Sequence, residues 1–494
     1  MSSSVQSSLV LGWEMTKGFD PTYWIGTKAA PGKHAPQDVV SVSAADIARH
    51  FIVVAQSGSG KSFFLGRLIE EILIKSKSRV VIVDPNSDFR RIALPVSGKL
   101  WETAKYDVAH RRGFLPDEAS VSAFKKNWDK VSKVVWSARI DRSGKDDALK
   151  IQRLEIDWTG ISTEVLSGEL DPVLESEIRR CHDFVRTISR LIAFTKAKDW
   201  SSKHDLLEVT QQLCESTRGM TQPQVAEKLR HDFTISAGPL TESEDTPKQV
   251  ITAAVDLLCR QASIHRAFVS EPMEKFYFSN AFDIRASRLL RRSNVSLVSE
   301  KVPRLQVVDI PSITESRFRP WIVSTILSTE WQRALRNWEI TLDNPPDEDS
   351  RVPTFIVIDE AHNLVPAEPR NYSEKGLREQ IRRIAAEGRK FGLFLILVSQ
   401  RPDKLDPLVV SECENRVVMK LGSQAVLSRT QELLGLTHIP ERLLERTLEF
   451  DVGRALLAGA WVNDNPVLMY SAARRTEEGG RNLRASYWAV GDHE

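Results

Sequence analysis

The segment at residues 55–62, AQSGSGKS, has the residue types and the spacing that bind a chain of phosphates. Glycine lets the backbone turn its N–H groups toward an anion, and the start of a following helix adds a positive dipole end. In this pattern Lys61 reaches the β- and γ-phosphates and the Ser62 hydroxyl binds Mg²⁺. The segment therefore predicts a P-loop that binds ATP with Mg²⁺, although Ala55 stands where the first glycine is usual. The predicted loop consists of Ala55, Gln56, Ser57, Gly58, Ser59, Gly60, Lys61 and Ser62.

An acidic pair, Asp359 and Glu360, ends the apolar run at residues 354–360, TFIVIDE. A buried strand that ends in aspartate beside a P-loop is a Walker B strand, and its carboxylate holds Mg²⁺ through water. The glutamate that follows is placed to polarise the water that attacks the γ-phosphate. We therefore expect Asp359 to position the metal and Glu360 to activate water.

A third apolar run, LFLILVSQ at residues 393–400, ends in Ser399 and Gln400. In a sheet of this kind, we expect the strand to lie between the P-loop strand and the Walker B strand. Its last polar side chain would then lie near the γ-phosphate. Gln400 is therefore our candidate for sensing that phosphate by a hydrogen bond.

Two arginines close to this strand are candidates for action across a subunit interface. Arg389 belongs to the segment GRKFG just before the strand, and Arg416 follows the strand. An arginine that a neighbouring subunit delivers to the γ-phosphate is worth about 10³ or more in rate. Arg389 is our first candidate and Arg416 our second, and the alternative for either is a surface ion pair.

Two further acidic residues follow the strand pattern RVVIVD at residues 79–84. Asp84 ends this run and Asp88 comes four residues later, at the sheet edge where α/β proteins bind ligands. Either side chain could contact the water shell of the metal or a neighbouring subunit. Equally, the Asp-Pro-Asn-Ser cluster at 84–87 could simply form a turn.

The composition limits where such a protein works. The chain has 494 residues and a net charge of only +2, so any site for nucleic acid must be local. Its four cysteines are far apart and form no CxxC pair, which is typical of a reducing cytoplasm. The N-terminus does not resemble a signal peptide, and no apolar run approaches about 18 residues. We therefore expect a cytoplasmic protein without membrane contact.

The elements that position these residues occupy two separated parts of the chain. We expect an α/β fold, a RecA-like P-loop NTPase core of the additional-strand, catalytic-glutamate type, split by a mostly helical insertion. The expected divisions are a short β-rich N-terminal segment (1–45), the first part of the core (46–115), the insertion (116–295), the second part of the core (296–474) and a C-terminal tail (475–494).

Two local features leave alternatives open. A basic cluster at residues 285–292 could bind phosphate groups or form a solvated helix face. The tail contains an aromatic pair, Tyr487 and Trp488, which could dock on a neighbouring subunit or belong to a partly disordered terminus.

Taken in order, the motifs resemble the HerA branch of the HerA/FtsK superfamily. The resemblance covers about residues 40–100 and 300–475 and rests on the segments AQSGSGKS, VIVDPNSDF, VVDI, FIVIDEAH, GRKFGLFLILVSQRP and GRALLAGA. It implies a homohexameric ATPase that moves double-stranded DNA through a central channel. It also implies a nuclease or another effector as partner, in DNA end processing or in defence against phage. The N-terminal segment is shorter than the β-barrel of typical members, so docking of a nuclease at that end does not follow.

Three other functions are open to a chain of this kind. One is an ATP-dependent ring scaffold that assembles and activates a partner enzyme without processive translocation. Another is a conjugative coupling ATPase or FtsK-type pump, which the lack of a membrane span disfavours. The third is a nucleotide-binding module without hydrolysis, which the intact Lys61, Asp359 and Glu360 disfavour.

Overall fold

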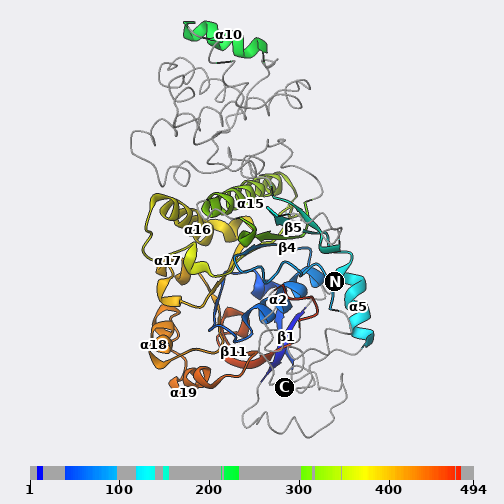
Figure 1. The fold of residues 1–494 in the computed structure, drawn as a ribbon, viewed down its shortest axis with the longest axis vertical. Coiled ribbons are helices and arrows are strands. Elements are labelled where there is room, and N and C mark those ends of the chain that lie inside the picture. Colours follow the sequence, from blue (N-terminus) through cyan, green and yellow to red (C-terminus); the bar gives the residue numbers. More distant parts are fainter. Residues whose placement is uncertain are drawn as a thin grey trace, which may run out of the picture.

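The computed structural model of the chain describes residues 8–14, 39–96, 118–139, 148–154, 213, 216–217, 219–232, 302–313, 318–345, 348–472 and 474–479. Its centre is one 12-stranded sheet with the strand order β2-β1-β12-β11-β10-β3-β9-β8-β4-β7-β5-β6 (Figure 1). The strands are β1 (Ser8–Glu14), β2 (Val39–Ser43), β3 (Phe51–Val54), β4 (Arg79–Asp84), β5 (Lys133–Ser137), β6 (Ile151–Arg153), β7 (Leu305–Asp309), β8 (Thr354–Ile358), β9 (Leu393–Ser399), β10 (Asn415–Val418), β11 (Arg454–Gly459) and β12 (Val467–Ser471).

The sheet has a parallel part and an antiparallel part. Neighbouring strands from β10 through β3, β9, β8, β4, β7 and β5 to β6 are all parallel. On the other side of β10, the strands β11, β12, β1 and β2 pair antiparallel. Because the parallel strands end at the same edge, the residues that follow β3, β8, β9 and β4 meet there.

Helices cover both faces of the sheet (Figure 1). The α-helices are α1 (Ala44–Ile47), α2 (Lys61–Lys75), α5 (Glu118–Trp128), α10 (Gln222–Asp232), α15 (Phe318–Asp343), α16 (Tyr372–Phe391), α17 (Pro407–Ser411), α18 (Gln424–Leu433) and α19 (Glu441–Glu445). Side chains of α2 and α5 pack with Val53 in one apolar core, whereas those of α15, α16 and α18 pack with Ile52 in another. Successive residues of a strand point to opposite faces, so a strand such as FIVV contributes to both cores.

The sequence predictions for the main strands and for the fold class are confirmed. The three apolar runs that carry the predicted site residues form β3, β8 and β9, and β9 lies between the other two, as expected. The fold is a RecA-like P-loop α/β fold. One difference concerns the predicted insertion: β5 and β6 fall inside it, yet they extend the central sheet beside β7. The basic cluster at 285–292 and the aromatic pair at 487–488 lie outside the described residues.

Within the described residues, no helix has the length and apolar character needed to cross a membrane.

The segment that follows β12 packs against the helix that begins at Lys61 and forms hydrogen bonds with it. Arg474 is fully buried and donates hydrogen bonds to the Ser62 carbonyl at 3.3 Å and to the Glu477 carbonyl at 2.8 Å. Glu70 is also fully buried and accepts hydrogen bonds from the backbone N–H groups of Arg475 and Thr476, at 2.9 Å and 2.8 Å. Gly66 leaves the space that the Arg474 side chain fills. This segment therefore fixes the first turns of α2 relative to the sheet.

We predict that Gly66→Ala destabilises the protein. Alanine is normally the better helix former by about 1 kcal/mol, but a Cβ at this position would overlap Cδ and Nε of Arg474. The expected loss is about 1–3 kcal/mol of unfolding free energy, measured by chemical denaturation. In an Arg474→Ala background the overlap is gone, so the same substitution should cost much less. An equal cost in both backgrounds would contradict this explanation.

Candidate active site

The loop predicted to bind phosphate lies at the carboxyl end of β3 and leads directly into α2. Gly58 and Gly60 have φ angles of +75° and +94°, which are left-handed conformations that favour glycine. The loop is tied to its neighbours by hydrogen bonds from Gln56 N–H to the Lys420 carbonyl and from Gly453 N–H to the Ser59 carbonyl, both 2.8 Å long. A side chain at Gly60 would crowd the backbone of Gly453, so this position also needs glycine for space.

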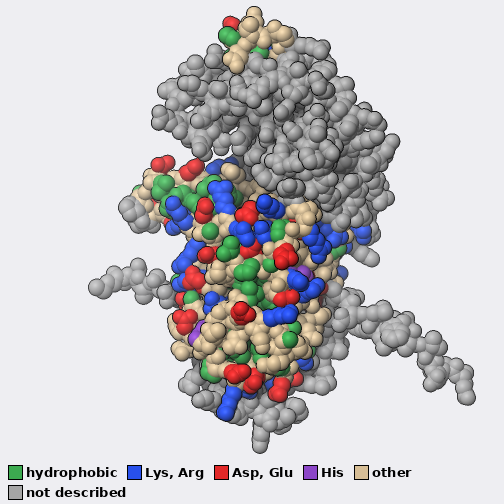
Figure 2. Space-filling view, turned by 90° about the vertical axis from the view of Figure 1, so that its left-hand side faces the viewer, with side chains coloured by type: hydrophobic (Ala, Val, Ile, Leu, Met, Phe, Trp, Pro, Cys, Tyr) green, Lys and Arg blue, Asp and Glu red, His purple; other side chains and the backbone are tan. Residues whose placement is uncertain are grey.

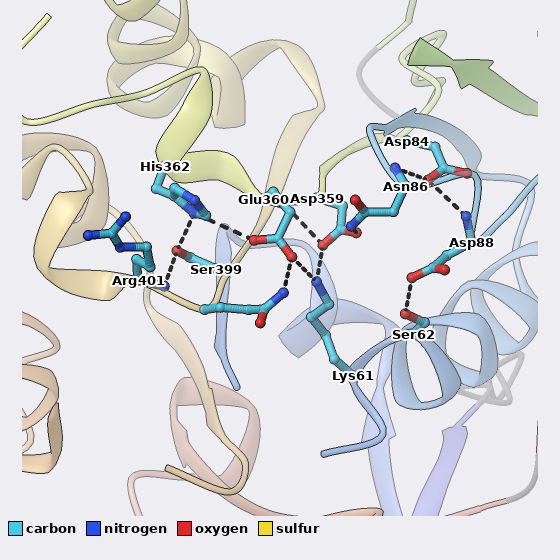
Figure 3. Close-up of polar contacts among 11 residues, drawn as sticks. Lys61, Ser62, Asp84, Asn86, Asp88, Asp359, Glu360, His362, Ser399 and Arg401 are labelled. Carbon is cyan, nitrogen blue, oxygen red and sulfur yellow. Dashed lines mark hydrogen bonds and ion pairs between the residues drawn. The ribbon is translucent and has the colours of Figure 1, made fainter. Parts of the chain in front are cut away.

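The ammonium group of Lys61 joins this loop to the predicted Walker B strand. Its Nζ lies 2.7 Å from Oδ1 of Asp359 and 2.6 Å from Oε1 of Glu360 (Figure 3). All three side chains are buried, with Lys61 8%, Asp359 0% and Glu360 7% exposed. Burial alone would lower the pKa of Lys61, but the two carboxylates raise it above its usual value. Likewise, burial favours neutral Glu360, yet the hydrogen bond from Lys61 and its charge keep the pKa of Glu360 below its usual value. The lysine is therefore charged and Glu360 is ionised.

Gln400 joins the same group of side chains. It follows the last residue of β9, and its Nε2 donates a hydrogen bond to Oε1 of Glu360. Lys61 and Gln400 thus share one carboxylate oxygen of Glu360. The structure brings together the four side chains that the sequence predicted to meet: Lys61, Asp359, Glu360 and Gln400.

The loop after β4 contacts both residues that were predicted to hold Mg²⁺. The Ser62 hydroxyl donates to Oδ2 of Asp88 at 2.6 Å, and Nδ2 of Asn86 lies 3.5 Å from Oδ2 of Asp359 (Figure 3). Asp84 has a different role, because its carboxylate accepts hydrogen bonds from the backbone N–H groups of Asn86, Asp88 and Phe89. Asp84 therefore shapes the turn, whereas Asp88 lies against Ser62.

The residues present fit a nucleotide with Mg²⁺. The start of α2 presents its positive dipole end to the loop, with the N–H groups of Phe63 and Phe64 bonded to the Gly60 carbonyl. The buried Ser59 hydroxyl has no partner among the described residues. The described residues contain no cluster of three or more His, Cys, Asp or Glu side chains around a common point. Mg²⁺ is usually held by one or two protein oxygens together with phosphates and water. Ser62 and Asp359 would supply those protein oxygens.

The two candidate arginines lie apart from this group of side chains. Arg389 in the last turn of α16 donates to Oε1 of Glu414 at 2.6 Å, and its side chain is 55% exposed. Arg49 also pairs with Glu414. Arg416 is on β10, and its buried Nε has no partner within the described residues. Neither Arg389 nor Arg416 contacts Lys61, Asp359 or Glu360 of its own chain. Figure 2 views the molecule from the side of α16 to α19 and shows basic and acidic side chains interspersed on that face.

Sequence reasoning missed two residues beside the acidic pair, Asp359 and Glu360. His362 lies in the short helix η5 (Ala361–Asn363), and its Nδ1 is 3.5 Å from Oε2 of Glu360 and 3.1 Å from Oγ of Ser399 (Figure 3). The available signal was the position of this histidine two residues after the acidic pair. Asn86 was passed over as part of a turn, although its side chain faces Asp359.

The chain is similar to known helicases. A sequence model of the family described as the central domain of the helicase HerA matches residues 32–329, more than half of the chain. A probable helicase of Methanocaldococcus jannaschii is 20% identical over 460 residues, which are 88% of this chain and 69% of that protein. The DNA double-strand break repair helicase HerA of Pyrococcus furiosus is 21% identical over 76% of this chain and 57% of its own length. The HerA of Sulfolobus acidocaldarius is 29% identical over 32% of this chain and 30% of its own length.

Two solved structures are similar to this chain at a lower sequence identity. VirB4 of Thermoanaerobacter pseudethanolicus is 13% identical, with a TM-score of 0.43, over 94% of this chain and 96% of that chain. The plasmid coupling protein TrwB in complex with ADP and Mg²⁺ is 13% identical, with a TM-score of 0.44, over 96% of this chain and 97% of that chain.

We predict that the Asp84→Asn variant gains stability relative to the wild type as the pH rises. Burial, together with the nearby Asp359 and Asp88, raises the pKa of Asp84 to about 7 against its backbone hydrogen bonds. Between the unfolded pKa near 3.8 and about 7, the folded protein binds more protons than the unfolded chain, so this residue costs stability as the pH increases. Asparagine stays neutral and removes that cost.

The measurement compares the free energies of unfolding of wild type and Asp84→Asn, obtained by chemical denaturation from pH 5 to pH 8. The difference should move in favour of the variant by on the order of 2 kcal/mol or more. Asp343→Asn, the same change at an exposed aspartate that ends α15, is the matched control and gives the baseline for the comparison. A difference that stays constant with pH would show that Asp84 is ionised in the fold.

Proposed function

Because this chain belongs to the family defined by the central domain of the helicase HerA, we propose that it is an ATP-hydrolysing motor that moves along double-stranded DNA. The observation that carries the proposal is the buried contact of Lys61 with Asp359 and Glu360, which unites the phosphate loop with the acidic pair. Family membership makes the chain an ATPase. The relatives named as DNA double-strand break repair helicases support DNA as the polymer along which it moves. We also propose a cytoplasmic location, which the four widely spaced cysteines without a CxxC pair favour.

In this proposal, each side chain acts on the nucleotide from the place that it holds in the structure. The backbone of residues 55–60 and the start of α2 bind the phosphates, and Lys61 exchanges its carboxylate partners for phosphate oxygens. Ser62 and Asp359 would hold Mg²⁺, which when bound neutralises charge that builds up on the phosphate oxygens. Glu360, released by Lys61, takes the proton of the attacking water. Gln400 exchanges its bond with Glu360 for one that reports the γ-phosphate.

We further propose that the active form is a homohexamer in which an arginine completes the site of the neighbouring subunit. The side chain of Arg389 is exposed and pairs with Glu414 at the surface, which supports its delivery to another subunit. Arg416 is the second candidate. An arginine acting in this way stabilises the negative charge of the transition state.

The proposed division of the chain keeps one ATPase core built from residues 46–115 and 296–474, with a mostly helical insertion between them. Strands β5 and β6 attach the start of that insertion to the core sheet. A partner nuclease or other effector, in DNA end processing or in antiphage defence, completes the proposal. The name of the Pyrococcus and Sulfolobus relatives, repair helicases of double-strand breaks, supports a role beside an end-processing enzyme.

The test of the proposed function is ATP hydrolysis by the purified protein with and without duplex DNA. A motor should hydrolyse ATP faster on duplex DNA, and the affinity for DNA should fall steeply as the salt concentration rises, because phosphate contacts release counterions. A ring that hydrolyses ATP only when a protein partner is added, and ignores DNA, would support the scaffold alternative and contradict the motor.

Two substitutions should separate nucleotide binding from hydrolysis. Lys61→Ala removes the cation that binds the phosphates, so it should abolish turnover and weaken ATP binding. Glu360→Gln keeps the shape of the side chain but removes its basicity, so it should bind ATP while turnover falls by about 10²-fold or more. Binding is measured with a fluorescent ATP analogue and turnover by phosphate release. Equal turnover in wild type and Glu360→Gln would remove Glu360 from its assigned role.

Mixed oligomers test whether Arg389 acts across an interface. Arg389→Ala subunits keep an intact Lys61, and Lys61→Ala subunits keep an intact Arg389, so mixing them rebuilds complete sites only if the two residues act from different subunits. We expect partial recovery of ATPase activity in mixed oligomers, whereas each variant alone is inactive. No recovery at any mixing ratio would argue against Arg389, and the same mixture with Arg416→Ala then tests the second candidate.

A further inference from the structure

The backbone conformation of Glu360 is unusual for a residue that should carry out chemistry. Its φ and ψ are both +47°, which lies in the left-handed region. Residues other than glycine seldom adopt this region, at a cost of about 1–3 kcal/mol. The residue sits between the end of β8 and η5, where it is buried, and its N–H donates to Oδ1 of Asp359 at 3.0 Å. Such a backbone conformation persists only where the surrounding structure holds the residue in place.

Different groups hold the two carboxylate oxygens of Glu360. Oε1 accepts from Lys61 and Gln400, and both of these side chains are expected to turn to the phosphates when a nucleotide binds. Oε2 faces Nδ1 of His362 at 3.5 Å. His362 has no expected role on the nucleotide, so its contact is the one that can persist during hydrolysis.

His362 is itself anchored from the neighbouring strand. Its Nδ1 lies 3.1 Å from Oγ of Ser399, the last residue of β9, which is fully buried. Ser399 Oγ also accepts the backbone N–H of Arg401 at 3.0 Å, which fixes the hydroxyl in place (Figure 3). Burial lowers the pKa of His362, which favours the neutral ring. With the Glu360 carboxylate beside Nδ1, the tautomer that carries its proton on Nδ1 is favoured, because a lone pair there would face a negative oxygen.

We infer that His362 is the positioning residue for Glu360 and that Ser399 is its anchor. The Nδ1–H group bridges Ser399 Oγ and Glu360 Oε2 and keeps the carboxylate aimed at the attacking water after Lys61 and Gln400 have turned to the phosphates. The contact runs from β9 to the end of β8, so the strand that presents Gln400 also sets the direction of the base. The inference rests on the proposed role of Glu360 and adds to it the group that holds Glu360 during turnover.

The experiment measures kcat, KM for ATP and nucleotide affinity of the full chain in wild type, His362→Ala and His362→Asn. Asparagine places an N–H donor near the position of Nδ1, whereas alanine removes the donor. For His362→Ala we expect kcat to fall about 10- to 100-fold while KM and nucleotide affinity stay within about threefold. His362→Asn should restore most of the lost kcat. Ser399→Ala should lower kcat in the same direction by a smaller factor.

Glu360→Gln is measured in parallel, alone and combined with His362→Ala. If His362 acts through Glu360, the second substitution adds no further loss of kcat to Glu360→Gln. If Glu360→Gln turns over like wild type, the proposed function of Glu360 fails. If Glu360→Gln is inactive while His362→Ala keeps the wild-type kcat, only the inference about His362 is overturned.

A purely structural role gives a different pattern. Loss of nucleotide affinity in proportion to kcat, or a His362→Asn variant as slow as His362→Ala although both unfold at the wild-type temperature, would overturn the positioning role. Thermal unfolding of each variant separates these outcomes from a failure to fold.

Discussion

The structure depends on one buried ionic contact, the ammonium group of Lys61 between the carboxylates of Asp359 and Glu360. Lys61 and Asp359 are 298 residues apart in the chain. A buried charge is costly unless it is paired, and removing one partner of such a contact typically costs 3–5 kcal/mol. The contact can form only if β3 and β8 end at the same edge of the sheet, with β9 between them. The order of the parallel strands therefore brings the phosphate loop and the acidic pair together.

The same contact involves the side chains that we propose act on the nucleotide. Lys61 and Gln400 occupy one oxygen of Glu360, and Ser62 donates to Asp88. The side chains of Lys61, Gln400 and Ser62 thus each have a protein partner of opposite or complementary character. In the proposed mechanism ATP would replace these partners, and binding of the substrate would release Glu360.

Much of the fold and of the site follows from local sequence pattern. The apolar runs before AQSGSGKS, before the acidic pair and before Gln400 are all strands, and the glycine loop precedes a helix, because burial on both faces of a parallel strand leaves little choice of residue. Contacts that depend on which strands become neighbours were harder to predict. Nothing in the residues around His362 shows that Ser399, on another strand, lies beside it.

Other differences have physical reasons of the same kind. β5 and β6 lie in a stretch whose sequence is charged and has a helical pattern, and they are recognisable as strands only through the pairing of β5 with β7 and of β6 with β5. For the acidic loop after β4, the sequence left a turn and a metal contact open, and the structure shows Asp84 in the turn and Asp88 against the Ser62 hydroxyl. The surface pairing of Arg389 with Glu414 could not be predicted, since several acidic side chains are available to an exposed arginine.

The most direct test of this account is a crystal structure of the full chain with Mg²⁺ and a non-hydrolysable ATP analogue. The account predicts that the phosphates lie on the loop at residues 55–62, that Lys61 Nζ has moved from Asp359 and Glu360 to phosphate oxygens, and that the Ser62 hydroxyl has left Asp88. An analogue bound elsewhere, or bound while Lys61 keeps both carboxylates, would contradict it.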